Sequence, residues 1–73
     1  MKWCNLEKET RRKDWFAIAI SPEQHWGYRD RLDAHAWCVK YPSDGKFYHH
    51  YTNTRWWFEK ESDALMFALT WNI

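Results

Sequence analysis

The stretch "RWWFEKESDALMFALTW", residues 55–71, decides most of the fold. Its second half carries an apolar stripe at positions i, i+3, i+4 and i+7, which is the spacing of an amphipathic helix. The stripe consists of Ala64, Phe67, Ala68 and Trp71, widened by Leu65 and Leu69. A helix of about ten residues is marginal on its own. We therefore expect it to dock on the rest of the protein, with Phe67 and Leu69 in the core and Ser62 or Asp63 as its N-cap.

The first half of the stretch, residues 55–59, predicts a short strand. Trp56 and Trp57 are neighbours, and neighbouring side chains on a strand point to opposite faces. One of them should lie under the helix while the other faces away from it. If the helix covers one side of a sheet, the opposite side collects aromatic rings from several strands. An exposed patch of that kind marks an interaction site.

The composition supports some aromatic residues at the surface. The chain has 73 residues, which predicts a single small domain over 1–73. Aromatic residues make up 21% of the chain, with 7 Trp, 4 Tyr and 4 Phe. A core of this size cannot enclose that many rings. Exposed Trp and Tyr are enriched where proteins meet their partners.

Charge and hydropathy exclude several classes of protein. The formal net charge is +1, and no apolar run approaches the roughly 18–20 residues that span a bilayer. The start of the chain lacks the apolar segment of a secretory leader. Cys4 and Cys38 are too few for a disulfide framework, so we expect an intracellular protein, with a single Cys4–Cys38 bridge as the alternative. The basic run at residues 11–13 is either a solvated face or a phosphate contact.

Two more strand signals lie in the middle of the chain. Residues 14–20 are apolar on both faces, which predicts an interior strand. Residues 34–42 alternate in polarity and are followed by "PSDG", with Gly45 expected at positive φ. The chain then returns as "KFYHHYT", so we expect a hairpin formed by 34–42 and 46–52.

Helix signals precede that hairpin. Ser21 as N-cap, Pro22 at the first position and Gln24 in a capping box predict a helix that ends near Leu32. Its one side would carry His25, Tyr28, Arg29 and Leu32. A loop with a single helical turn is the other interpretation. Residues 2–13 are compatible with either a short helix or a mobile tail.

The residues with chemical potential form no known catalytic or metal-binding pattern. The chain has four histidines and two cysteines, without C-x-x-C or H-x₃₋₅-H spacing. We therefore predict no metal and no cofactor, although His35 and His49 would face each other across the expected hairpin. Cys38 is expected to be a buried, unreactive thiol. With no glycine-rich phosphate loop either, we predict that the protein is not an enzyme.

The end of the chain resembles a known kind of protein. Trp57-Phe58, Asp63-Ala64, Phe67, Leu69 and Trp71 are similar to the C-terminus of short uncharacterised proteins from tailed bacteriophages. Those proteins often finish with an aromatic strand, an acidic break and a helix of the type D-A-x-x-F-x-L-x-W. The resemblance covers roughly the last quarter of the chain. It implies a viral protein in the cytoplasm of a bacterial host, where small phage proteins commonly bind and redirect a host protein.

Together these patterns predict an α+β fold, with three or four antiparallel strands and the C-terminal helix packed on one face. The favoured function is a non-enzymatic interaction protein that binds a bacterial host protein to inhibit or modulate it. The expected binding surface is the aromatic and basic face of the sheet. It comprises Trp37, Tyr41, Tyr48, Tyr51, Arg55 and Trp56. A slip of one residue in strand register would exchange this set for the opposite face.

A module that binds single-stranded nucleic acid is the alternative function. Aromatic rings on a sheet, flanked by Lys and Arg, can stack bases. The rings and cations of that platform would be Phe47, Tyr48, His49 and Tyr51 with Lys40, Lys46 and Arg55. No membrane partner is expected, and a homo-oligomer is compatible with the sequence.

Overall fold

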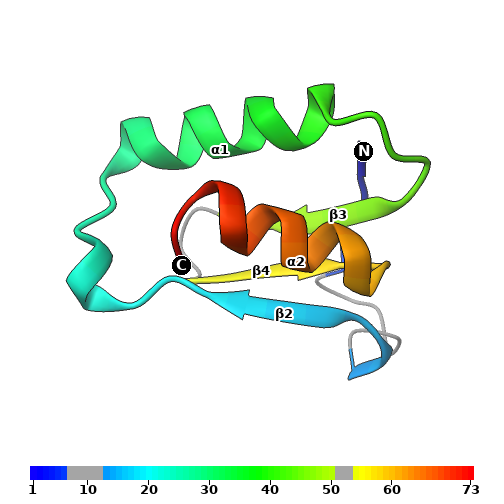
Figure 1. Ribbon diagram of the computed structural model, residues 1–73, viewed down its shortest axis with the longest axis horizontal. Helices are drawn as coiled ribbons and strands as arrows, with labels where there is room; N and C mark the ends of the chain where they lie inside the picture. Colours follow the sequence, from blue (N-terminus) through cyan, green and yellow to red (C-terminus); the bar gives the residue numbers. More distant parts are fainter. Residues whose placement is uncertain (7–12, 51–53) are drawn as a thin grey trace.

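A computed structural model describes residues 1–6, 13–50 and 54–73 (Figure 1). The elements in chain order are β1 (Lys2–Trp3), β2 (Phe16–Ala19), the 3₁₀ helix η2 (Pro22–Gln24), α1 (Tyr28–Lys40), β3 (Lys46–His49), β4 (Arg55–Phe58) and α2 (Glu61–Thr70). Residues 2–3 form a strand, so the predicted helix does not begin there. Residues 4–6 are not helical either, whereas residues 7–12, with the basic pair Arg11–Arg12, and Tyr51 lie outside the described residues.

The four strands form one sheet in the order β1-β3-β4-β2. The α+β fold, with the C-terminal helix on the sheet, is confirmed, but the sheet is mixed rather than antiparallel. β3 and β4 pair antiparallel, as do β4 and β2, whereas β1 runs parallel to β3. Parallel pairing requires a long connection, and the chain between β1 and β3 supplies one that contains β2 and α1.

β2 lies at the edge of the sheet, so the prediction of an interior strand is wrong. Apolar side chains on both faces of a strand carry information about the faces of the sheet. They do not tell whether one or two neighbouring strands pair with its backbone. Of the two faces, α2 contacts the one that carries Phe16 and Ile18. The other face of β2 presents only Ala17 and Ala19, both of which are exposed.

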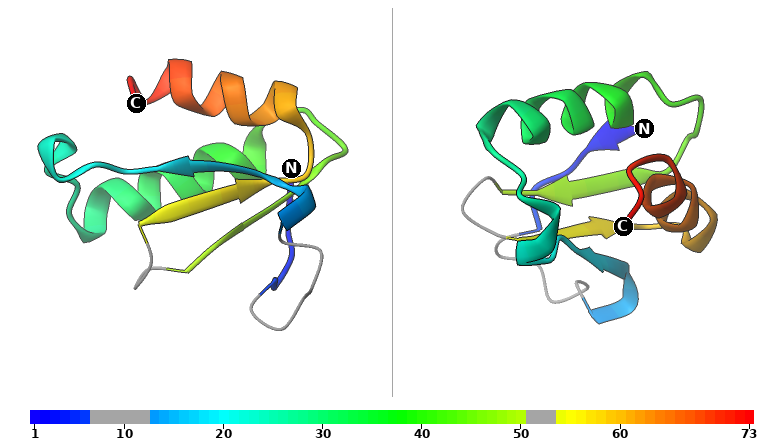
Figure 2. Two further views of the ribbon diagram at one scale, coloured as in Figure 1. Left: turned by 90° about the horizontal axis from the view of Figure 1, so that it is seen from below. Right: turned by 60° about the vertical axis from the view of Figure 1, so that its left-hand side comes forward.

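Both helices pack on the same side of the sheet (Figure 2). Between helices and sheet lies a core of Met1, Ile20, Ala34, Cys38, Phe47, Trp56, Phe58, Ala64 and Phe67. The stripe of α2 is confirmed, since Ala64 and Phe67 are buried while Ala68 and Trp71 are partly buried. The prediction that Leu69 lies in the core is wrong, because 77% of this residue is exposed. A spacing of two residues turns about 200° around a helix, so Leu69 points away from the side that Phe67 buries.

Residues 34–40 belong to α1, and the predicted hairpin over 34–42 and 46–52 does not form. Alternation of small and large residues in that stretch is compatible with a strand. However, Ala34 and Cys38, the two fully buried residues of α1, are spaced i, i+4 and so share one helical face. The hairpin consists of β3 and β4 instead. The segment "PSDG" connects α1 to β3.

Gly45 has a role other than the predicted one. No glycine in the structure has positive φ. Instead, a Cβ atom built on Gly45 would lie 2.5 Å from Oδ2 of Asp63. That carboxylate is buried at the start of α2 and accepts a hydrogen bond of 2.7 Å from Ser43 Oγ. Gly45 is therefore required by the close approach of the turn to α2.

The predicted helix starts differ from the observed ones. Ser21 begins only the short η2, and α1 starts after Gly27, whose backbone N–H donates to Asp30 Oδ2 at 2.8 Å. Lys60 is the N-cap of α2, so neither Ser62 nor Asp63 caps that helix. Asp30 therefore caps the start of α1 from inside the helix, whereas Lys60 makes no side-chain capping bond at the start of α2.

Candidate functional site: a pocket lined by three histidines

Trp56 and Trp57 point to opposite faces of the sheet, as predicted. Trp56 is 0% exposed and shares the helix-covered face with its pairing partners Ile18 and His49. Trp57 pairs with Ala17 and Tyr48 on the other face and is half-buried. Trp56 therefore belongs to the core, and its assignment to an exposed binding face is wrong.

The residues predicted to form a binding face do not come together on one surface. Tyr48 is only 3% exposed and lies on the sheet face opposite to that of Trp56. Trp37 and Tyr41 stack on each other, with centroids 4.8 Å apart, at the C-terminal end of α1. Both pack against the core. Arg55 is exposed at the start of β4.

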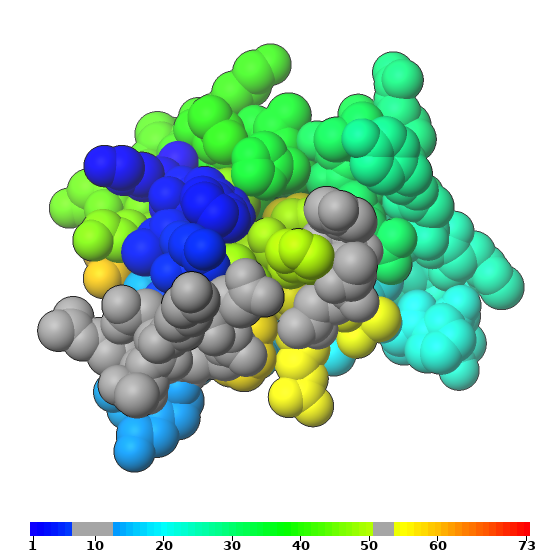
Figure 3. Space-filling view, turned by 180° about the vertical axis from the view of Figure 1, so that it is seen from behind, coloured from blue at the N-terminus to red at the C-terminus, as the bar shows by residue number. Residues whose placement is uncertain are grey.

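The platform expected to stack nucleic-acid bases is also not presented at the surface. Phe47 is 0% exposed, and Tyr48 is nearly as buried. The ring of Trp3 lies 5.9 Å from that of Tyr48. From the side opposite to Figure 1, the N-terminal residues are seen next to the segments of α1 and β3 (Figure 3).

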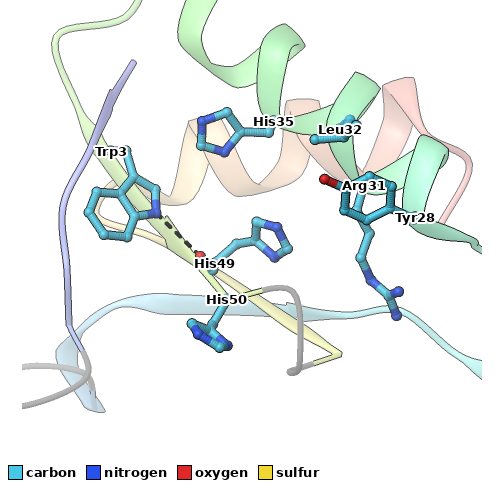
Figure 4. A pocket seen from close by; sticks show the side chains of 7 residues that line it. All are labelled: Trp3, Tyr28, Arg31, Leu32, His35, His49 and His50. Carbon is cyan, nitrogen blue, oxygen red and sulfur yellow. Dashed lines mark hydrogen bonds between the residues drawn. The ribbon is translucent and has the colours of Figure 1, made fainter.

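The candidate site is a pocket of about 340 Å³ between the N-terminal half of α1 and the edge of the sheet formed by β1 and β3 (Figure 4). Its lining consists of Trp3, Tyr28, Arg31, Leu32, His35, His49 and His50. The volume falls at the lower end of the range for ligand pockets in proteins. Its walls combine apolar rings with groups that can donate hydrogen bonds.

His49 is positioned by contacts on two sides. Its ring stacks on Trp56 with centroids 3.7 Å apart and an interplanar angle of 1°. The hydrogen bond from Glu59 N to Lys46 O makes 46 and 59 a bonded pair, so His49 and Trp56 are a non-hydrogen-bonded pair, whose side chains are closest. Trp3 Nε1 donates to the carbonyl oxygen of His49 at 3.2 Å. The imidazole therefore has a fixed orientation.

The pocket is electrostatically one-sided. Burial, reinforced by electrostatic interaction with His35, Arg31 and His50, lowers the pKa of His49 to about 4. Burial also lowers the pKa of His35. Both imidazoles are therefore neutral at pH 7, and Arg31 supplies a permanent positive charge. Among the described residues of the lining there is no carboxylate.

Two polar atoms of the lining have unmet hydrogen-bonding capacity. Arg31 Nε and His49 Nδ1 are buried and have no hydrogen-bond partner in residues 1–6, 13–50 and 54–73. A buried donor without a partner costs about 1–3 kcal/mol, and more when it is charged. An oxygen acceptor within hydrogen-bonding distance of Arg31 Nε would remove that cost.

The described residues give little support for a metal site or a reactive thiol. His35 and His49 do meet, with centroids 6.3 Å apart, although through the packing of α1 on β3 rather than across a hairpin. No group of three or more His, Cys, Asp or Glu side chains suited to a metal ion occurs in the described part of the chain. Cys4 and Cys38 are free. Burial raises the pKa of the Cys38 thiol to about 12, so it stays protonated.

The rim of the pocket is exposed and apolar. Trp3 is 41% exposed, Tyr28 69% and Leu32 48%. The sequence placed His25, Tyr28, Arg29 and Leu32 on one side of a helix ending near Leu32. Tyr28 and Leu32 do share one side of α1, but His25 precedes that helix, which continues to Lys40. The sequence did not identify Trp3, Arg31 or His50 as neighbours of that side, because β1, β3 and α1 meet only in the tertiary structure.

No protein-family model, curated protein or solved structure matches this chain. Within the described residues, none of the helices has the length and apolar character needed to cross a membrane.

Proposed function

We propose that this chain is a non-enzymatic interaction protein that binds another protein through the pocket and its rim. The supporting observation is the combination of three large exposed apolar side chains, Trp3, Tyr28 and Leu32, around a pocket of about 340 Å³. Exposed aromatic and aliphatic groups beside a concave site are typical of the central part of protein interfaces.

The charge of the pocket favours a particular kind of partner segment. Arg31 is positive, His49 is neutral at pH 7, and the described part of the lining has no carboxylate. An Asp or Glu side chain of the partner would provide the acceptor that Arg31 Nε lacks. Apolar neighbours of that acid would rest on Trp3 and Leu32. The partner segment is therefore acidic with flanking apolar residues.

The source of the partner follows from the similarity of residues 57–71 to tailed-phage proteins. It supports a phage-encoded protein in the cytoplasm of a bacterial host, where the partner is a host protein that becomes inhibited or modulated. Of the residues that carry the similarity, Phe58, Ala64 and Phe67 pack in the core, and none of the set lines the pocket. They therefore support the origin of the chain and contribute nothing to the binding surface.

The test is capture of a host protein from bacterial lysate on immobilised protein, with two matched variants. Leu32→Glu adds a negative charge to the rim, while Leu69→Glu adds the same charge to the outer side of α2. Both positions are exposed. We expect wild type and Leu69→Glu to retain one host protein and Leu32→Glu to lose it. Titration with the purified host protein should show at least a tenfold weaker affinity for Leu32→Glu, equivalent to about 1.4 kcal/mol.

Two outcomes would contradict the proposal. Capture that survives Leu32→Glu but not Leu69→Glu would place the surface on α2. Failure of wild type to retain a protein, together with quenching of Trp fluorescence by oligonucleotides and strong salt dependence, would favour nucleic acid.

A further inference from the structure

The free edge of β2 presents backbone groups of two alanines. Ile20 N donates to Thr54 O at 2.8 Å, which continues the β2–β4 pairing by one residue and makes 20 and 54 a hydrogen-bonded pair. Bonded and non-bonded pairs alternate along antiparallel strands. The N–H and C=O groups of residues 16, 18 and 20 therefore point to β4, and those of Ala17 and Ala19 point out of the sheet.

Apart from its length of four residues, β2 shows none of the features that normally prevent an edge strand from pairing, as far as the described residues go. Natural edge strands are protected by charges, proline, bulges or short length. β2 reads Phe-Ala-Ile-Ala, and its register with β4 is continuous. Phe16 is 39% exposed, and Ala17 and Ala19 are exposed as well. By contrast, β1 at the opposite edge has only two residues, one of which is Lys2.

We propose that β2 pairs antiparallel with β2 of a second copy of this chain, about a two-fold axis at Ile18. The paired segment 16–20 has Ile18 at its centre. Ala17 of each copy therefore lies opposite Ala19 of the other. These two pairs exchange four hydrogen bonds through the outward-pointing groups. The four-stranded sheets of the two copies then form one continuous sheet.

Side chains are compatible with the same register. On the helix-covered face, Ile18 meets Ile18 of the second copy, and Phe16 meets Ile20 of the second copy. On the other face alanine meets alanine, so no bulky group blocks the approach of the two backbones. Cross-strand pairs of apolar and aromatic residues each contribute about 0.2–1 kcal/mol.

Charge also favours a second copy as the occupant. Residues 15–21 contain no charged residue, so no like charges face each other across the axis. The net charge of +1 creates little repulsion between two copies.

This dimer would leave the histidine-lined pocket free, because β1 and β3 lie on the other side of β4 from β2. A dimer would carry two such pockets and could bind two partner molecules, or one symmetric partner with increased avidity. The dimer does not depend on the proposed function, and either can fail without the other.

The test uses sedimentation velocity on the full chain with two edge variants. Ala17→Pro removes an outward N–H that makes no bond to the described residues of its own copy, and Ala19→Lys adds a charge to the same edge. We expect wild type to sediment as a dimer at about 200 µM, a concentration that detects micromolar dissociation constants. Both variants should sediment as monomers while keeping the wild-type circular dichroism spectrum. If Ala17→Pro fails to fold, Ala19→Lys decides alone.

The register is tested by cross-linking in a Cys4→Ser background. Ile18→Cys should form a disulfide dimer under mild oxidation, because the two Cα atoms of a non-hydrogen-bonded pair lie about 4.5 Å apart. Ala17→Cys is the matched control, since residues 17 of the two copies are diagonal and too far apart. A monomeric wild type, or a dimer that survives Ala19→Lys, would overturn the proposal. Equal cross-linking at 17 and 18 would overturn the register.

Discussion

The two helices cover the same face of the sheet, but α2 lies over closely packed rings whereas the N-terminal half of α1 lies over a pocket. Beneath α2, Phe67 packs on Trp56 at 5.0 Å and on Phe58 at 4.9 Å, and these three rings are 0% exposed. Beneath the N-terminal half of α1 lies the pocket, in which Arg31 Nε and His49 Nδ1 are buried without hydrogen-bond partners. The α2 side is packed with aromatic rings, although Trp56 Nε1 and Trp71 Nε1 also lack partners among the described residues. The pocket side differs in placing its unmet polar groups next to the exposed apolar side chains Trp3 and Leu32.

This difference separates residues that stabilise the fold from residues available for binding. Trp26 marks the boundary, since its ring contacts those of Trp56, Phe67 and Trp71 at centroid distances of 5.6–6.4 Å. It is one of the residues that follow η2 and precede α1. Changes on the α2 side should therefore alter stability, and changes around the pocket should alter binding or pH response.

The largest expected effect is that of Phe67→Ala. Removal of a fully buried ring leaves a cavity among aromatic neighbours, so the free energy of unfolding should fall by about 3–5 kcal/mol. Urea denaturation followed by circular dichroism measures it. Leu69→Ala, on the outer side of the same helix, should change stability by less than about 0.5 kcal/mol. Similar losses for the two variants would mean that α2 is rotated from the described position.

The next effect is a pH dependence that comes from the pocket. The pKa of His49 is about 4 in the folded protein and near 6.5 when unfolded, so the unfolded chain binds the proton more readily. Stability is therefore complete above about pH 6.5 and falls as the pH drops towards 4, by about 2–3 kcal/mol. The lowered pKa of His35 acts in the same direction.

Urea midpoints measured between pH 7 and pH 4 test this dependence. His49→Phe keeps a ring against Trp56 but cannot titrate, so most of the loss below pH 6.5 should disappear in that variant. Unchanged pH dependence in His49→Phe would mean that other groups cause it.

A smaller effect is expected where the turn meets α2. Gly45→Ala places a methyl group 2.5 Å from Asp63 Oδ2, so the turn or the carboxylate must move. We expect a loss of about 1–3 kcal/mol in thermal or urea denaturation. Gly27→Ala is the matched control. A Cβ atom on Gly27 would have Asp30 Oδ2 as its nearest neighbour, at the ordinary contact distance of 3.8 Å. That change should cost less than about 1 kcal/mol, and an equal cost would contradict the close approach at Gly45.

The smallest effect on stability is expected at the rim. Leu32→Glu should leave the free energy of unfolding within about 0.5 kcal/mol of wild type, because Leu32 is 48% exposed. Its consequence should appear only in partner capture. A large loss of stability in Leu32→Glu would show that the rim belongs to the packed part of the molecule.

Local patterns predicted some of these features and missed others for an identifiable reason. The stripe of α2 was predictable because Ala64, Phe67 and Trp71 repeat at the helical period over adjacent turns. The sequence predicted that Trp56 and Trp57 point to opposite faces of the sheet. It did not predict which of the two lies under the helices. The pocket was not predictable, since Trp3, Leu32 and His49 come from β1, α1 and β3, which have no local relation in sequence.

The sequence by itself determined the class of fold, the aromatic character of the core and the position of α2. These features depend on composition and on side-chain periods within a single element. Only the tertiary structure decided that residues 34–40 are helical, that β1 runs parallel to β3, and that β2 is an edge. Hydrogen-bonding neighbours and helix-to-sheet contacts join residues far apart in the chain, and periodicity carries no information about such contacts.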